Sequence, residues 1–236
     1  HAAMRGETVG FLSLEMGRSE LATRLMAIAS GEKVGELERG PWFKREAYQR
    51  AAEYMDDMRR TTGGQVYINR QPLSRLTDLT QCLRYYRETH GAKYFIIDYL
   101  QLARTQDGHS LHERIETVSH TLRELTGQLG VVLVALSQFN RQTSAVRAER
   151  PVSQGLMGGS AIENDSHQVL LFDHSRFERK DWYADTWLIV DKNRHGGVLD
   201  IPVRWDYRTL RLEPRVPPPA TDGWSSRTHN PQGATR

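Results

Sequence analysis

The chain has 236 residues, which is about one and a half times the length of a typical domain, so one large domain with a tail is expected. Hydrophobic residues make up 38% and charged residues 26%, a composition that supports a core but excludes membrane-embedded and collagen-like proteins. The single cysteine, Cys82, excludes an internal disulfide and favours a reducing compartment, most simply the cytoplasm. A net charge of +3 mildly favours a polyanionic partner without identifying one.

The predicted elements alternate in type over the first part of the chain. Short apolar runs predict strands at 8–14, 66–69, 94–98 and 131–136. Apolar positions at helical spacing predict helices at 21–29, 43–60, 74–90 and 111–129. Apolar strands that alternate with helices are typical of a parallel sheet covered by helices, so the expected fold class is α/β.

The pattern changes after Phe139. Residues 140–160 are polar, contain glycine and have no sustained hydrophobic period, which predicts long mobile loops. Further strands are predicted at 168–173, 187–191, 198–203 and 209–212, with an antiparallel hairpin that turns at His195-Gly196-Gly197. From Pro214 onward the sequence is rich in proline and polar residues, a composition typical of disorder. We therefore expect one domain over 1–212 and a disordered tail over 213–236.

Three polar residues lie at the carboxyl ends of predicted strands, where the ligands of open parallel sheets bind: Asp98 ends its strand, and Glu15 and Gln138 follow theirs. Asp98 is suited to hold a Mg²⁺ water shell beside nucleotide phosphates, but such a residue also caps turns. Glu15 is suited to polarise an attacking water, or it is a charge at a helix start. Gln138 is suited to sense a phosphate, or it is a solvated amide.

Two groups of cations are further candidates. Lys192 and Arg194 are two residues apart, so on a strand both side chains point the same way and could contact phosphate oxygens together. The alternative is a solvated basic edge strand. Arg141, Arg147 and Arg150 could grip a nucleic-acid backbone, or they serve only solubility.

Five segments in order resemble the RecA-like motor domain of replicative DnaB-family DNA helicases. They are SLEM, IIDYLQL, ALSQFNR, GSAIENDSHQVLLFDHSR and DKNRHGG, and the resemblance spans residues 1–212. It implies a RecA-like, largely parallel sheet flanked by helices, with a C-terminal antiparallel hairpin. By matching position, Glu15 resembles the catalytic glutamate, Asp98 the Walker B aspartate that holds Mg²⁺ through water, and Gln138 the sensor of the ATP γ-phosphate.

The same resemblance implies an assembly and partners. Lys192 and Arg194 resemble a pair that reaches the ATP of a neighbouring subunit, which implies a homohexameric ring. The implied activity is ATP-dependent unwinding of duplex DNA at the replication fork by translocation on single-stranded DNA. A primase and a helicase loader are implied as partners, and no membrane is expected.

The implied DNA-binding residues lie in two loops. Arg141 and Arg147 belong to one, and the segment from Met157 matches the other, in which the backbone N–H groups of Gly158, Gly159 and Ser160 could hold phosphates. Met157 and Gly158 stand where many family members have arginine and glutamate.

One expected motif is absent from the sequence. No GxxxxGK[ST] loop, which cradles the β- and γ-phosphates of a nucleotide, occurs in it. We therefore expect the loop and its strand upstream of His1, and this segment to be a fragment of the motor, inactive and aggregation-prone when isolated. Two other interpretations stay open, namely a recombination ATPase of the RecA and RadA type and a catalytically silent ring subunit that binds DNA.

Overall fold

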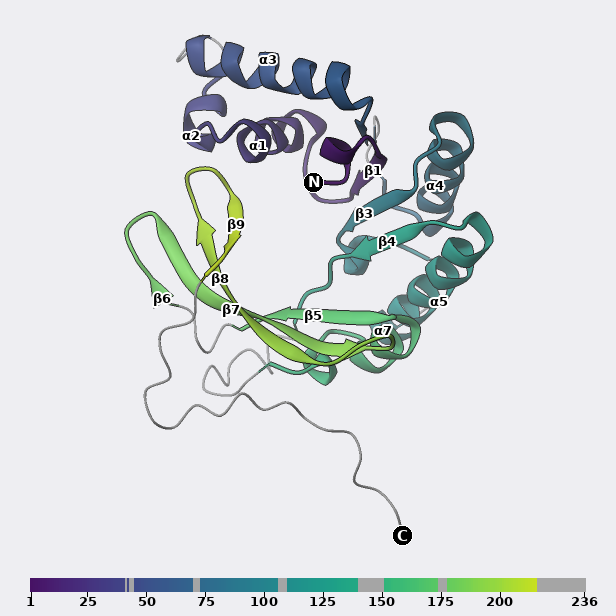
Figure 1. The fold of residues 1–236 in the computed structure, drawn as a ribbon. Helices are drawn as coiled ribbons and strands as arrows, with labels where there is room; N and C mark the ends of the chain where they lie inside the picture. The colour runs from purple at the N-terminus through teal and green to yellow at the C-terminus, as the bar shows by residue number, and fades with distance from the viewer. Residues whose placement is uncertain are drawn as a thin grey trace, which may run out of the picture.

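The computed structural model describes residues 1–40, 42, 45–69, 73–105, 110–139, 151–173 and 178–215. Its first sheet has four parallel strands in the spatial order β2-β1-β3-β4 (Figure 1). These strands are β1 (Thr8–Ser13), β2 (Gln65–Ile68), β3 (Tyr94–Asp98) and β4 (Val132–Ala135). The strands predicted for this part of the chain are therefore confirmed.

The helices form two groups around this sheet (Figure 1). The first group follows β1 and consists of α1 (Arg18–Ser30), α2 (Val34–Leu37) and α3 (Arg45–Thr62). The second group lies beside β3 and β4 and consists of α4 (Leu76–His90) and α5 (Leu111–Leu129). A short 3₁₀ helix, η1 (Ala3–Arg5), precedes β1. No helix among the described residues is long and apolar enough to cross a membrane.

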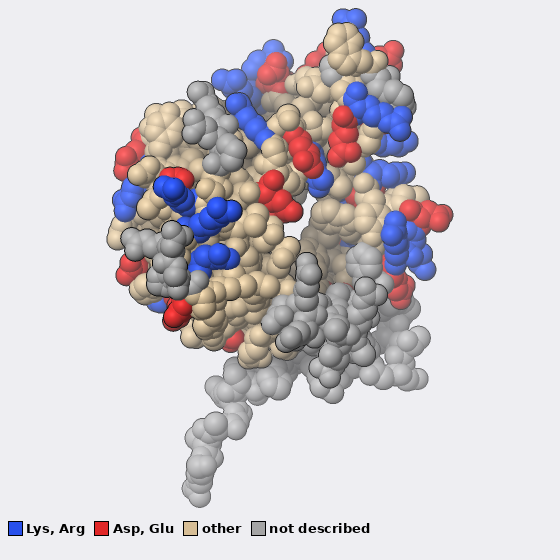
Figure 2. Space-filling view, turned by 180° about the vertical axis from the view of Figure 1, so that it is seen from behind, with Lys and Arg blue, Asp and Glu red and all other residues tan. Residues whose placement is uncertain are grey.

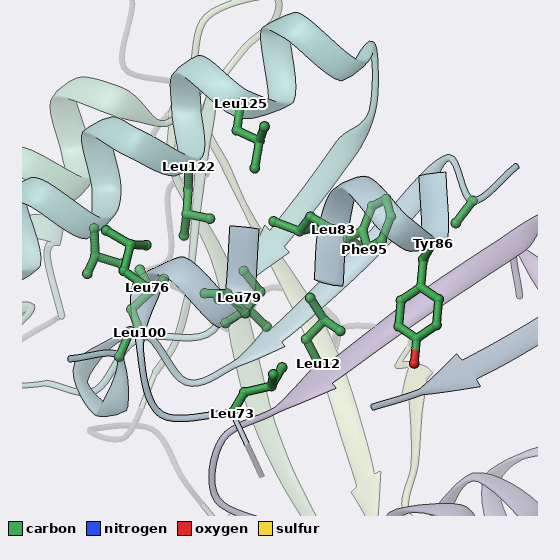
Figure 3. Packing of buried hydrophobic residues seen from close by; sticks show 14 residues of the cluster. Leu12, Leu73, Leu76, Leu79, Leu83, Tyr86, Phe95, Leu100, Leu122 and Leu125 are labelled. Atoms are coloured by element: carbon green, nitrogen blue, oxygen red, sulfur yellow. The ribbon is translucent and has the colours of Figure 1, made fainter. Parts of the chain in front are cut away.

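The main core lies between the first sheet and the second helix group (Figure 3). Leu12 and Phe95 from neighbouring strands pack against Leu79 and Leu83 of α4 and Leu122 of α5, and all five are almost completely buried. The leucines of α4 lie at helical spacing on one face, which is why this segment folds as a helix against the sheet. A rigid base therefore supports the ends of β1, β3 and β4.

A second sheet of five strands follows, in the order β5-β7-β8-β9, with β6 pairing β7. Its strands are β5 (Gln168–Phe172), β6 (Glu178–Arg179), β7 (Tyr183–Asn193), β8 (Leu199–Asp206) and β9 (Arg211–Pro214). All pairs are antiparallel, and the predicted hairpin joins β7 to β8. The antiparallel region is larger than a hairpin because β5, β6 and β9 also pair in this way.

The prediction of loops throughout 140–160 is wrong at its end. The 3₁₀ helix η3 (Ser153–Gly155) and the start of helix α7 (Gly159–Asp165) fall within it. Asp165 at the end of α7 accepts hydrogen bonds from Ser119 and Arg123 of α5, so tertiary contacts hold a helix that has little periodicity of its own. Residues 140–150 of the predicted loop lie outside the described residues. The predicted start of the tail at 213 is too early, because Glu213 and Pro214 pair with β8 as part of β9, and the tail beyond 215 lies outside the described residues.

Candidate functional site

The carboxyl ends of β1, β3 and β4 lie side by side. Ser13 is in register with Asp98, whose carbonyl oxygen accepts a hydrogen bond from the Leu14 N–H at 2.7 Å. On the other side of β3, the Leu136 N–H donates to the carbonyl oxygen of Ile97 at 2.9 Å. Asp98 therefore ends β3, and Glu15 and Gln138 follow the neighbouring strands β1 and β4, all at the carboxyl ends of the strands. Ligands of open parallel sheets bind at these ends.

A buried amide fixes the end of β1. Asn69 follows β2, and its Oδ1 accepts a hydrogen bond from the Ser13 N–H at 2.9 Å while its Nδ2 donates to the Ser13 carbonyl oxygen at 3.1 Å. The Ser13 hydroxyl in turn accepts from the N–H of Met16 at 2.8 Å. These bonds hold the turn that carries Glu15 after the strand has ended.

The Asp98 carboxyl lies in an electrostatically unfavourable place for a negative charge. Burial raises its pKa above the ordinary value, and the nearby negative charge of Glu15 raises it further. Arg24 of α1 opposes this shift through its positive charge and also pairs with Glu20 at 2.9 Å. Two carboxylates and a cation thus lie together at the carboxyl ends of the strands. A bound divalent cation would relieve the repulsion between the carboxylates.

The residues present fit Mg²⁺ held with a nucleotide rather than a metal held by protein alone. Among the described residues, no group of three or more His, Cys, Asp or Glu side chains is placed to hold a metal ion. Mg²⁺ keeps several waters when it binds with substrate phosphates, so a half-buried Asp98 at a strand end fits a carboxylate that would hold such an ion through water.

Lys192 and Arg194 reach the same helix end. The Lys192 ammonium donates to the carbonyl oxygen of Glu163, and the Arg194 Nη2 donates to that of Asn164 at 2.6 Å. Both acceptors lie in the last turn of α7, where the partial negative charge of a helix attracts cations. Lys192 lies in β7 and Arg194 in the turn that follows it, and within one chain both side chains bind α7. Joint contact with phosphate oxygens stays a prediction.

The expected DNA-binding residues are only partly placed. Arg141 and Arg147 lie outside the described residues. Gly158 has a left-handed backbone with φ of 81°, and a Cβ there would overlap the Ile115 side chain, so packing against α5 requires glycine. The N–H of Gly159 donates to the carbonyl oxygen of Leu156 at 2.9 Å, so this amide is engaged within the chain. Ser160 is exposed on the first turn of α7.

Charge alone does not mark a binding face. On the face that Figure 2 shows, Lys and Arg side chains are interspersed with Asp and Glu, and a large area carries neither. This agrees with the near balance of 32 basic and 29 acidic residues. On this face, therefore, the described basic side chains form no continuous surface, and recognition of a polyanion there would depend on local groups.

Sequence reasoning missed three residues of this region, namely Asn69, Arg24 and Gln101. Gln101 lies in the 3₁₀ helix η2 (Leu100–Leu102), is buried, and hydrogen-bonds to the segment that follows β4. A polar residue at the carboxyl end of a predicted strand was a usable signal for Asn69, which follows β2 in the structure. For Gln101 the sequence offers only its place within IIDYLQL, three residues after Asp98.

Comparison with known proteins gives consistent relatives. The family model of the DnaB-like helicase C terminal domain matches residues 1–214. A probable plasmid replicative DNA helicase of Chlamydia trachomatis is 29% identical over 205 residues, which are 87% of this chain and 44% of that protein. The replicative DNA helicase DnaB of Leifsonia xyli is 30% identical over 210 residues, 88% of this chain and 45% of that protein. The chain thus spans under half the length of these relatives.

Solved structures resemble the fold over most of the chain. One is described as a DnaB-like replicative helicase and its interactions with primase; its TM-score is 0.73 at 21% identity, and the likeness covers 88% of this chain and 50% of that one. The ATPase domain of G40P gives a TM-score of 0.74 at 21% identity, covering 89% and 75%. The RecA-like fold implied by the five sequence segments is therefore confirmed. Because the family model matches residues 1–214, the chain belongs to the DnaB-like helicase family through its C-terminal domain.

Proposed function

We propose that this chain is part of the motor of a replicative DNA helicase, a homohexameric ring that hydrolyses ATP, moves along single-stranded DNA and unwinds the duplex at the replication fork. The observation that carries the proposal is that Asp98 at the end of β3 lies between the ends of β1 and β4, which Glu15 and Gln138 follow. Family membership supports it. The cytoplasm, as the site of replication, and association with a primase and a loader belong to the same proposal.

The proposed roles follow from the chemistry of each group. Asp98 holds Mg²⁺ through water, Glu15 polarises the attacking water, and Gln138 contacts the γ-phosphate. Lys192 and Arg194 reach the ATP of a neighbouring subunit. To do so, their side chains exchange the carbonyl oxygens of α7 for phosphate oxygens as hydrogen-bond acceptors. Arg141, Arg147 and the segment of Gly158, Gly159 and Ser160 line the path of the DNA.

The phosphate-cradling loop is proposed to lie outside residues 1–236, and the strand that precedes it is proposed to pair between β4 and β5. Supporting this, Val132 and Val134 of β4 are 53% and 51% exposed, and Leu170 and Phe172 of β5 are 53% and 49% exposed. Apolar side chains on unpaired strand edges are a liability that proteins normally cover. We accordingly propose that the isolated segment does not turn over ATP.

The test is strand displacement on forked DNA by the full-length protein. We expect Glu15→Gln to lower kcat for ATP by about 10²-fold or more and to abolish unwinding, since a general base contributes about that factor. Glu88→Gln, at an exposed position of α4, is the matched control and should leave both rates unchanged. Unwinding by Glu15→Gln at the unsubstituted rate would contradict the proposal.

A further inference from the structure

Gln101 joins two segments that are far apart in sequence. Its side chain is 7% exposed, and its Nε2 donates to the Ser137 Oγ at 2.7 Å and to the Met157 carbonyl oxygen at 3.3 Å. Its Oε1 accepts from the N–H of Gln138 at 3.4 Å. One buried amide therefore contacts both the segment that carries Gln138 and the residue that precedes Gly158.

The two segments also contact each other directly. The Met157 N–H donates to the Gln138 carbonyl oxygen at 3.0 Å, and Phe139 and Leu156 form an antiparallel bridge. The backbones at Gln138 and Met157 are therefore joined directly. A change in position at one end of such a linked pair must be accommodated at the other, because packed interiors deform little.

The fold fixes Gln101 between these groups. It follows Asp98 by three residues, so the end of β3 holds it on one side. The Leu100 N–H before it donates to the Leu136 carbonyl oxygen at 3.0 Å, and the Gln101 carbonyl oxygen accepts from Arg114 Nη2 of α5 at 3.3 Å. Backbone bonds to the residue after β4 and to α5 thus hold Gln101 in place beside the two segments that its amide contacts.

We propose that Gln101 is a positioning residue that transmits the state of the nucleotide site, sensed at Gln138, to the DNA-binding segment that begins at Met157. The inference rests on the proposed function and adds the link between its two sites. An amide is suited to this link because it donates and accepts at once. A carboxylate keeps the acceptor for the Gln138 N–H but loses the donors that hold Met157, and a thioether loses both.

The experiment compares ATP hydrolysis by the full-length protein with and without single-stranded DNA. We expect the stimulation by DNA, as the ratio of stimulated to basal rate, to fall about 5-fold or more in Gln101→Met and Gln101→Glu, the range of a typical coupling between sites. The ratio of DNA affinities with a non-hydrolysable ATP analogue and with ADP should fall toward one. Gln128→Met is the matched control, since this exposed glutamine of α5 contacts only Arg84 among the interactions found for the described residues.

The outcomes separate the inference from the function on which it rests. Full stimulation in folded Gln101→Met and Gln101→Glu, or basal and stimulated rates that fall in the same proportion, overturns the inference. Absence of stimulation in the unsubstituted protein overturns the proposed function instead. If the Gln101 variants fail to fold, Ser137→Ala removes one acceptor of the same amide and should lower the stimulation partially; undiminished stimulation there also overturns the inference.

Discussion

Asp98 is placed at a cost to stability. Its pKa is raised in the folded protein by burial and by the charge of Glu15, so folding disfavours the ionised form. The destabilisation is fully present above the folded-state pKa and vanishes below the pKa of the unfolded chain. Such groups are typical of functional sites, where local strain is retained because the chemistry requires it.

Replacing this carboxyl should therefore stabilise the protein while it removes activity. We expect Asp98→Asn to raise the melting temperature at neutral pH. The free energy of unfolding should rise by no more than about 1 kcal/mol, because solvent screens a half-exposed group. The gain should disappear as the pH falls below the ordinary pKa of aspartate. Thermal melting across this pH range, beside ATP hydrolysis, checks both parts; a lower melting temperature at neutral pH would count against the electrostatic account.

The pKa of Asp185 is shifted in the opposite direction to that of Asp98. Arg204 hydrogen-bonds to its carboxylate at 2.8 and 3.1 Å and Arg215 pairs with it at 3.2 Å, which lowers its pKa. Its stabilisation is present above the unfolded pKa and is lost as the pH falls through the folded pKa. Asp185→Asn should cost about 2 kcal/mol at neutral pH, as for hydrogen bonds to a charged group. Chemical denaturation measures this, with Asp57→Asn in an exposed pair as the control; equal losses would refute the prediction.

At the scale of elements, α7 is held at its C-terminal end by other parts of the chain. Lys192 and Arg194 bind its last carbonyls, and Asp165 is bound by Ser119 and Arg123. A helix of seven residues has little stability of its own, so these contacts determine whether it persists.

The contribution of Lys192 and Arg194 to the stability of α7 can therefore be measured. Arg194→Ala should speed hydrogen exchange of the α7 amides by about 5-fold, since a hydrogen bond from a charged group to a carbonyl contributes about 1 kcal/mol or more. Lys93→Ala removes a cation that pairs with Glu7 near the start of β1, and it should leave α7 unchanged. Unaltered exchange in Arg194→Ala would mean that the hydrogen bond to Asn164 contributes nothing.

The elements that the sequence predicted well are those whose pattern is local. β3 and α5 occur at the predicted residues because an apolar run and a helical stripe each identify a buried face. Helix α7 was missed because Gly158 and Gly159 are typical of loops, whereas in the fold they allow close packing against Ile115 and Ser153. The role of Gln101 was equally hidden, since its partners lie 36 and 56 residues away.

For the whole molecule, strand order alone brings the candidate site together. Glu15, Asp98 and Gln138 were predicted from a general rule about strand ends, and the order β2-β1-β3-β4 places their strands next to one another. The order itself depends on contacts between segments far apart in sequence. Only the resemblance to a known family pointed to it beforehand.

The same order leaves β4 at the edge of the four-stranded sheet, and this determines how the isolated segment should behave. An edge with exposed Val132 and Val134 offers both hydrogen-bonding groups and apolar area to another copy. Sedimentation velocity of the segment 1–236 should therefore show concentration-dependent association, and Val134→Lys should reduce it because an edge lysine opposes strand pairing. Trp42→Lys is the control, as this side chain is 95% exposed but lies in no strand. A monodisperse monomer, or equal relief by both substitutions, would show that the β4 edge is not where copies meet.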